Sequence, residues 1–161
     1  MSRIRYAAAS LAACGLVAAL AAVPASAKAT TLHFFSKDVY VRLSDSSGKA
    51  LPSNSSPAVG DRLSIAANDY AGNHKHHAKG ATASDHIVCN VTGPGTGLCD
   101  GMIALGGAML LGDDFVVNFA SNAPTAIKIT GGTGRYRRAH GTVVAKSVGT
   151  NTTDLTITIG S

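Results

Sequence analysis

Side chains that could move a proton or bind a polar group occur at three places in this sequence. They are Asp69 and Tyr70 in NDYAGN, Asp85 before an apolar run, and Tyr136, Arg138 and His140 in RYRRAHG. A carboxyl group in apolar surroundings can act as a general acid or base, and a histidine near a tyrosine and an arginine can polarise a carbonyl. The sequence therefore offers these six residues as candidates for ligand binding, with Asp85, Asp69, His140 and Tyr136 as candidates for catalysis.

Each candidate also has a purely structural interpretation. Tyr136, Arg138 and His140 would share one face of a strand, which is either the inside of the domain or a solvated outer face. Asp69 could be a turn residue, and Asp85 could lie at the rim of a strand that begins later than expected. The residues alone leave these alternatives open.

Three histidines follow one another closely in NHKHHAKG, at His74, His76 and His77. Imidazoles at this spacing can bind zinc or copper adventitiously, but an organised site usually draws its ligands from separate rigid elements. We therefore predict no physiological metal and no cofactor.

The composition indicates the elements that must position these residues. The chain has no Glu, Gln or Trp, whereas Gly, Thr, Val and Ser are plentiful. Because Glu and Gln favour helices and β-branched residues favour strands, we expect an all-β domain. Expected strands are Thr31–Leu43, Arg62–Asn68, Asp85–Val91, Leu98–Leu105, Ala108–Leu111, Phe115–Phe119, Ala126–Thr130, about Arg135–Val148, and Thr153–Ile159. About eight strands with short turns indicate a barrel or a sandwich.

The N-terminal segment has the pattern of a signal peptide. Arg3 and Arg5 precede an apolar run, and Ala25-Ser26-Ala27 presents small residues, so we predict cleavage after Ala27 and a secreted domain at 28–161. The alternative is a lipoprotein box ending at Cys14, which would leave the protein anchored. No later stretch approaches the roughly 20 apolar residues that span a bilayer, so we expect no membrane insertion.

Two cysteines follow the predicted leader, Cys89 and Cys99. In an exported protein such a pair predicts a disulfide. They flank the turn sequence TGPGTG, and if Cys89 lies opposite Cys99, then Ile87 faces Gly101 and Asp85 faces Ile103. This register also points Asp85 toward the apolar side, where a carboxylate needs a partner.

The glycine-rich segment ITGGTGRYRRAHGTV could suggest a phosphate-binding loop, but the pattern does not fit. A dinucleotide fingerprint needs a third glycine and a following helix, and a P-loop needs Gly-Lys-Ser/Thr. The net charge of the whole chain is only +5, and no aromatic platform accompanies the arginines, so we expect no nucleic-acid partner. A connection between two strands is the remaining interpretation.

This segment, together with VGDRLSIAANDYAGN, CNVTGPGTGLCDGMIALGGAMLLGDD and TTDLTITI, resembles the allene oxide cyclase and dirigent superfamily, in particular its secreted bacterial members. The likeness covers roughly Leu32 to Ile159. It implies an eight-stranded antiparallel barrel with an apolar lumen, often assembled as a trimer. The dirigent proteins orient phenoxy radicals in that lumen, and the cyclase folds an unstable fatty-acid epoxide.

The chain departs from both patterns. The cyclase glutamate after the glycine loop is absent, and Arg135 and His140 stand where dirigent proteins commonly have an acid and an arginine. Asp69 is the residue that matches a dirigent functional acid. We therefore expect a barrel that orients a small apolar molecule of lipid or phenolic class. A cyclase or isomerase, or a structural barrel without ligand, is the alternative.

Overall fold

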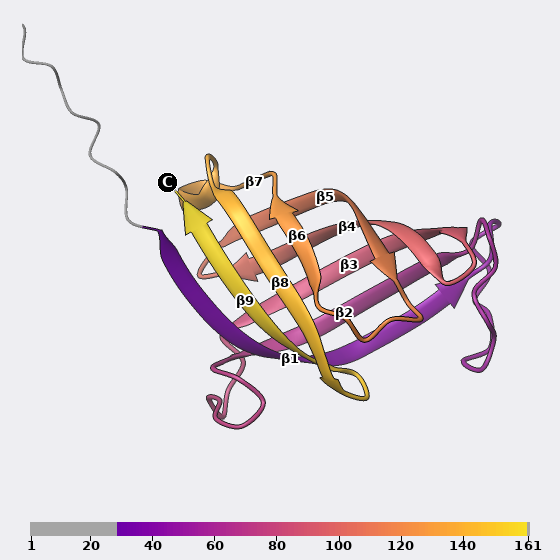
Figure 1. Cartoon of the computed structure of the whole chain (residues 1–161), viewed down its shortest axis with the longest axis horizontal. Coiled ribbons are helices and arrows are strands. Elements are labelled where there is room, and N and C mark those ends of the chain that lie inside the picture. The colour runs from indigo at the N-terminus through magenta and orange to yellow at the C-terminus, as the bar shows by residue number, and fades with distance from the viewer. Residues whose placement is uncertain (1–28, 161) are drawn as a thin grey trace, which may run out of the picture.

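The computed structural model describes residues 29–160, so the predicted signal peptide, its cleavage after Ala27 and the alternative box at Cys14 lie outside the described residues. The described chain forms a single antiparallel sheet that curls into a nearly closed barrel (Figure 1). Its strands are β1 (Thr30–Ser44), β2 (Arg62–Ala71), β3 (Ala83–Gly93), β4 (Thr96–Leu105), β5 (Ala108–Asn118), β6 (Thr125–Ile129), β7 (Gly131–Gly132), β8 (His140–Gly149) and β9 (Thr152–Gly160). The prediction of an all-β antiparallel barrel is confirmed.

The order of the strands across the sheet is β6-β8-β9-β1-β2-β3-β4-β5-β7. The first and last strands are neighbours, with Thr30 opposite Ile159 and Lys37 opposite Thr152. β6 pairs with β8, and β7 pairs with β5. Only Thr130 separates β6 from β7, so this one segment of the chain connects the two edges of the sheet. The two-residue strand β7, which none of the expected ranges contains, makes this closure.

The hairpin of β3 and β4 has the register that the cysteines predict. Cys89 lies opposite Cys99, Ile87 opposite Gly101 and Asp85 opposite Ile103. A disulfide joins Cys89 and Cys99, and both residues are buried in the apolar core. The disulfide therefore fixes which residues of β3 point into the barrel.

Two strand predictions were wrong. Ala108–Leu111 and Phe115–Phe119 form one strand, β5, in which Asp114 adopts a positive φ of 55° and the register with β4 shifts between Cys99 and Gly101. Such a bulge adds an unpaired residue without ending the strand, and the sequence pattern alone presented it as a break.

The second error concerns the start of β8, which was expected at about Arg135. Residues Gly134–Tyr136 form a 3₁₀ turn (η1), and β8 begins at His140. Gly134 has a φ of 54°, and the N–H groups of Tyr136 and Ala139 donate to the carbonyls of Thr133 and Tyr136. The backbone thus satisfies its hydrogen bonds locally before the ladder with β9 starts.

β1 is the longest strand and has a bulge between Asp38 and Tyr40. Its ladder with β9 ends at Lys37, whereas its ladder with β2 continues to Ser44. Val39 and Val41 are accordingly 62% and 51% exposed. The barrel wall is therefore incomplete along the second half of β1. No helix within residues 29–160 has the length and apolar character needed to cross a membrane.

Candidate functional site

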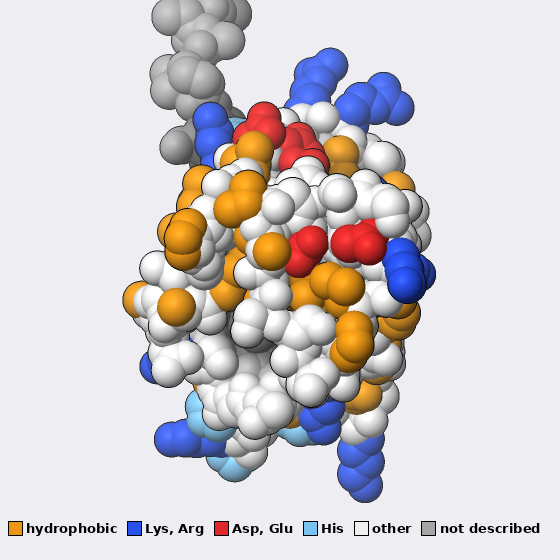
Figure 2. Space-filling view, turned by 90° about the vertical axis from the view of Figure 1, so that its right-hand side faces the viewer, with side chains coloured by type: hydrophobic (Ala, Val, Ile, Leu, Met, Phe, Trp, Pro, Cys, Tyr) orange, Lys and Arg blue, Asp and Glu red, His pale blue; other side chains and the backbone are white. Residues whose placement is uncertain are grey.

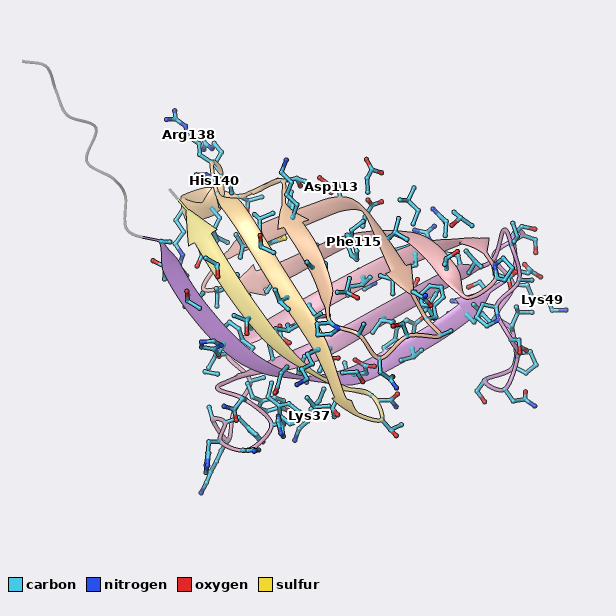
Figure 3. All side chains as sticks on the ribbon, viewed as in Figure 1. Lys37, Lys49, Asp113, Phe115, Arg138 and His140 are labelled. Carbon is cyan, nitrogen blue, oxygen red and sulfur yellow. A yellow bond between two sulfur atoms is a disulfide. The ribbon has the colours of Figure 1, made fainter. Side chains whose placement is uncertain are left out.

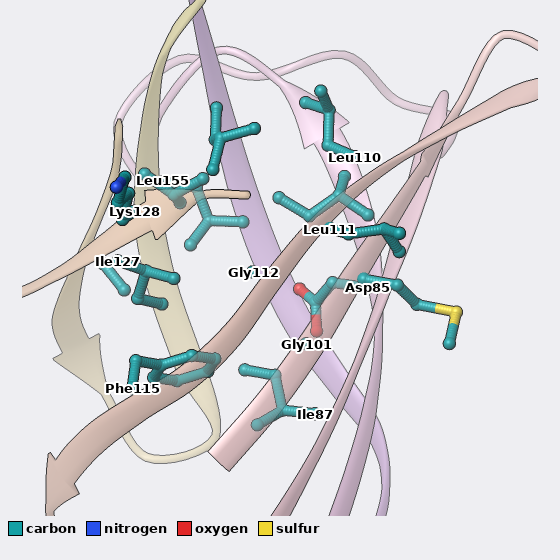
Figure 4. A pocket seen from close by; sticks show the side chains of 15 residues that line it. Asp85, Ile87, Gly101, Leu110, Leu111, Gly112, Phe115, Ile127, Lys128 and Leu155 are labelled. Atoms are coloured by element: carbon teal, nitrogen blue, oxygen red, sulfur yellow. The ribbon is translucent and has the colours of Figure 1, made fainter. Parts of the chain in front are cut away.

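A cavity lies inside the barrel between two facing walls (Figure 4). Its apolar lining includes Ile87, Leu110, Phe115, Ile127, Val143 and Leu155. The empty volume is about 470 Å³ when the solvent at its mouth is counted, and about 50 Å³ of it can hold the centre of a water molecule. The space is therefore narrow, which suits a small, flat ligand.

Two glycines in the lining allow the facing walls of the cavity to lie close together. A Cβ atom on Gly112 would lie 2.8 Å from Cγ2 of Ile127, and one on Gly101 would lie 3.4 Å from the ring of Phe115. Glycine at these positions lets β5 approach β6 and lets the Phe115 ring lie against β4. Larger residues there would push the facing strands apart or fill the cavity.

Asp85 is the acidic side chain in the cavity wall among residues 29–160. Its carboxylate projects among apolar neighbours in Figure 4, and Oδ2 accepts a hydrogen bond of 2.9 Å from the hydroxyl of Ser36 on β1. The prediction that the disulfide register points Asp85 inward is confirmed by its place in this lining.

Asp69 lies beside Asp85 on the inner face of β2. It is fully buried, with 0% of its surface exposed, and it pairs across the strands with Ser36 and Ala83. Within the described part of the chain, neither carboxyl oxygen of Asp69 has a hydrogen-bond partner when both carboxyls are taken as acceptors. An O–H on Asp69 could donate to Asp85, so the arrangement favours one proton held between the two residues.

The protonation of the pair follows from this burial. Burial and, to a smaller extent, the negative charge of Asp85 together raise the pKa of Asp69 from 3.8 to about 8. The pKa of Asp85 is raised as well, by burial first, although hydrogen bonds from Ser36 and Asp69 oppose this effect. At neutral pH the pair can both store and give up a proton, which is what a general acid or base needs.

Sequence reasoning missed two members of this cluster, Ser36 and Asp38. Ser36 is 3% exposed, and the pKa of Asp38 is raised by partial burial and then by the charge of Asp85. Ser36 and Asp38 follow the core residue Phe34 at alternate positions of β1, so their side chains point to the same face of the strand as Phe34. That alternation was the available signal.

Tyr70 lies on the face of β2 opposite to Asp69. The centroid of its ring is 5.5 Å from the centroid of the His77 ring. The same centroid is 5.1 Å from the ammonium nitrogen of Lys37. It therefore packs under the loop that follows β2 and lies away from the cavity.

The Tyr136, Arg138 and His140 cluster does not form inside the barrel. Tyr136 is in η1 and packs against the core from the barrel end, whereas Arg138 and His140 are exposed. Figure 3 shows Arg138 and His140 together at the end where the C-terminus lies, away from Phe115. The three side chains would share one face only if residues 136–140 formed a strand, whereas Tyr136 lies in η1 and β8 begins at His140.

The histidine-rich loop is held by other contacts. Nδ1 of His74 lies 2.5 Å from Oδ2 of Asp154 on β9, and the ring of His77 stacks near Phe35 with centroids 4.8 Å apart. In residues 29–160 no three His, Cys, Asp or Glu side chains come together as a metal site. These histidines attach the loop to the outside of the barrel.

No protein-family model matches the chain, and neither does any curated protein sequence. Solved structures do match. Pyocyanin demethylase aligns with a TM-score of 0.58 at 22% identity, over 81% of this chain and 99% of that one. The pterocarpan synthase dirigent protein GePTS1 aligns with a TM-score of 0.58 at 18% identity, over 82% and 83%. A second one, PsPTS1, gives 0.52 at 18% identity, over 82% and 92%. The chain therefore has the same barrel fold as these three proteins.

Proposed function

We propose that this protein binds a small, largely apolar molecule in the barrel lumen and holds it in one orientation, as a template. The observation that carries the proposal is the narrow apolar cavity with the Asp85 carboxylate in its wall. Apolar walls supply affinity through burial, and one fixed polar group supplies orientation. The fold shared with two dirigent proteins, both named pterocarpan synthases, supports the same use of the lumen.

We further propose that the mature domain is 28–161, that it is secreted, and that it assembles as a homotrimer. The disulfide between Cys89 and Cys99 supports export, because disulfides persist in oxidising compartments. Intact mass of the exported protein tests cleavage after Ala27, and native mass spectrometry tests the trimer. An N-terminus far from Lys28 would overturn the cleavage site.

Native mass spectrometry of the purified protein, before and after incubation with lipids and phenolics extracted from the producing culture, tests ligand binding. We expect a discrete added mass, one per barrel. The variant Ala145→Phe fills the lumen from β8 and should abolish the added mass. Ala126→Phe adds the same ring to the exposed face of β6 and should keep it. A clean apoprotein under every condition would indicate a structural barrel.

A second candidate, a cyclase or isomerase, is favoured by the Asp69–Asp85 pair. Asp85 could take a proton from one atom of a bound substrate and return it at another, with Asp69 storing the proton. Such an isomerisation needs no co-reactant. In an enzyme, Asp85→Asn would abolish product formation. In a template the same variant would keep most of the ligand affinity and lose selectivity between products.

A further inference from the structure

The charges that face the lumen are all of one sign. Three acidic side chains that influence one another lie on neighbouring strands, Asp38 on β1, Asp69 on β2 and Asp85 on β3, and Asp85 lines the cavity. From β4, β5, β6, β8 and β9 the cavity lining is apolar except for Lys128. Lys128 alternates with the buried Ile127 and Ile129 and is exposed. The described lumen thus has an acidic wall and an apolar wall, with no basic side chain directed between them.

The acidic wall lacks a counter-charge. Ser36 gives Asp85 one hydrogen bond, whereas the completely buried Asp69 can be satisfied only by a proton shared with Asp85, and no positive side chain of the described barrel lies against the pair. Two neighbouring carboxylates in apolar surroundings cannot both ionise unless a positive charge lies close by. A cation in the cavity would supply that charge at Asp85, which is the acid that the cavity reaches.

The wall across from Asp85 suits the rest of such a ligand. The ring of Phe115 lies against Gly101, which has no side chain, and Ile127 and Leu155 complete an apolar surface. An aromatic ring attracts a cation through its negative face. Seen from the end of the barrel that carries the loop after β1, acidic side chains lie near the middle and at the upper edge of the face, and Lys and Arg lie toward its margins (Figure 2). The acidic side chains near the middle favour the approach of a positive charge at this end.

We infer that the lumen takes a flat aromatic cation, a ring system of one or two rings with a quaternary or protonated nitrogen, placed with its charge against Asp85. The inference rests on the proposed function and deepens it, because it names the class of ligand. It follows from the cavity, from the buried Asp69–Asp85 pair at its wall and from the absence of an inward basic side chain in the described barrel.

N-methylquinolinium and 1-methylnaphthalene test the inference, because the two probes have the same shape and differ in charge. Affinities are measured by titration calorimetry at about pH 6 and about pH 9, on either side of the pKa of Asp69, which is about 8. We expect the cation to bind about tenfold or more tightly than its neutral isostere at the higher pH.

The pH dependence should have a definite sign. A cation favours ionised Asp69 and Asp85, so its affinity should rise with pH and its binding should release protons, which appear as a dependence of the heat on the buffer. Affinity for 1-methylnaphthalene should change little. The inference would be overturned if a neutral carbonyl compound such as 1-naphthaldehyde bound more tightly than the cation and its affinity fell as pH rises. That result would show that the lumen binds neutral hydrogen-bond acceptors.

Variants separate the lumen from the surface. Asp85→Asn and Asp69→Asn should each reduce the preference for the cation by about tenfold or remove it. Asp114→Asn, which removes one charge from an exposed position on β5, should leave it unchanged. Melting temperatures of the variants check that they fold. If Asp85→Asn does not fold, the buffer-dependent heat of the unmodified protein still decides.

Failure of the inference and failure of the proposed function give different results. If both probes bind equally and Ala145→Phe abolishes both, the lumen binds apolar ligands without charge preference, and only the inference is wrong. If neither probe binds and the culture extract also adds no mass, the proposed function is wrong as well.

Discussion

Two groups of polar side chains that are equal candidates in the sequence have opposite environments in the structure. Asp69 and Asp85 lie on inward faces of β2 and β3, within long ladders that fix their direction. Arg138 and His140 lie at the barrel end, after a turn, and are exposed. The comparison shows that strand alternation predicts a side chain's direction only where the ladder is continuous.

The largest expected effect on stability comes from a substitution in the glycine-rich segment 129–143, and it would show that this segment has a structural role. Gly141 has a φ of 144°, and a Cβ atom there would overlap the carbonyl oxygen of Thr158 on β9. Gly141→Ala should lower the free energy of unfolding by about 3 kcal/mol or more, because both the backbone conformation and the close approach are lost. Denaturant unfolding measures this. Gly107→Ala, at a φ of 78° with open space around it, is the control for conformation alone.

The disulfide stabilises the β3–β4 hairpin, which carries the lumen residue Asp85. Removing it with Cys89→Ala and Cys99→Ala together should cost about 2–3 kcal/mol of stability, because the unfolded chain regains freedom. The ligand preference should persist in variant molecules that remain folded, since the β3–β4 ladder also positions Asp85. Denaturant unfolding curves of the parent and of the double variant, measured at the same pH, give this difference in stability. An unchanged midpoint would show that the ladder alone holds the hairpin.

Asp69 should make stability depend on pH. Its pKa is raised from 3.8 to about 8, so the folded protein holds this proton more tightly than the unfolded chain does. Stability is therefore greatest below about pH 4 and falls as pH rises to about 8. Asp69→Asn removes part of this decline and should be more stable than the parent by about 2 kcal/mol above pH 8, with little difference at pH 4. Equal pH profiles would contradict the assignment of a buried proton to Asp69.

The smallest effect is expected at the barrel end. Arg138→Ala and His140→Ala should each change stability by no more than about 0.5 kcal/mol, because both side chains are exposed. Probe binding in the lumen should also be unchanged. A loss of binding in either variant would move the functional site to the glycine segment and reverse the comparison.

Particular residues show how far sequence reasoning reaches. Cys89 and Cys99 set the β3–β4 register, so the inward direction of Asp85 could be predicted before any coordinates. Asp69 was named, but its burial beside Asp85 depends on β1 and β2 pairing side by side, which no local pattern reveals. Asp38 was missed because the strand Thr31–Leu43 was predicted without assigning either of its faces to the interior. The turn at Gly134–Tyr136 was missed because three alternating polar residues imitate a strand.

The pairing of β1 with β9 has a consequence for how the protein is made. Thr30 is matched with Ile159, so the barrel can close only after nearly the whole chain has left the ribosome. Contacts this distant in sequence form slowly, and until they do the inner faces and the edges of β1 remain open to other chains. The barrel is therefore completed only when the last strand, β9, becomes available to pair with β1.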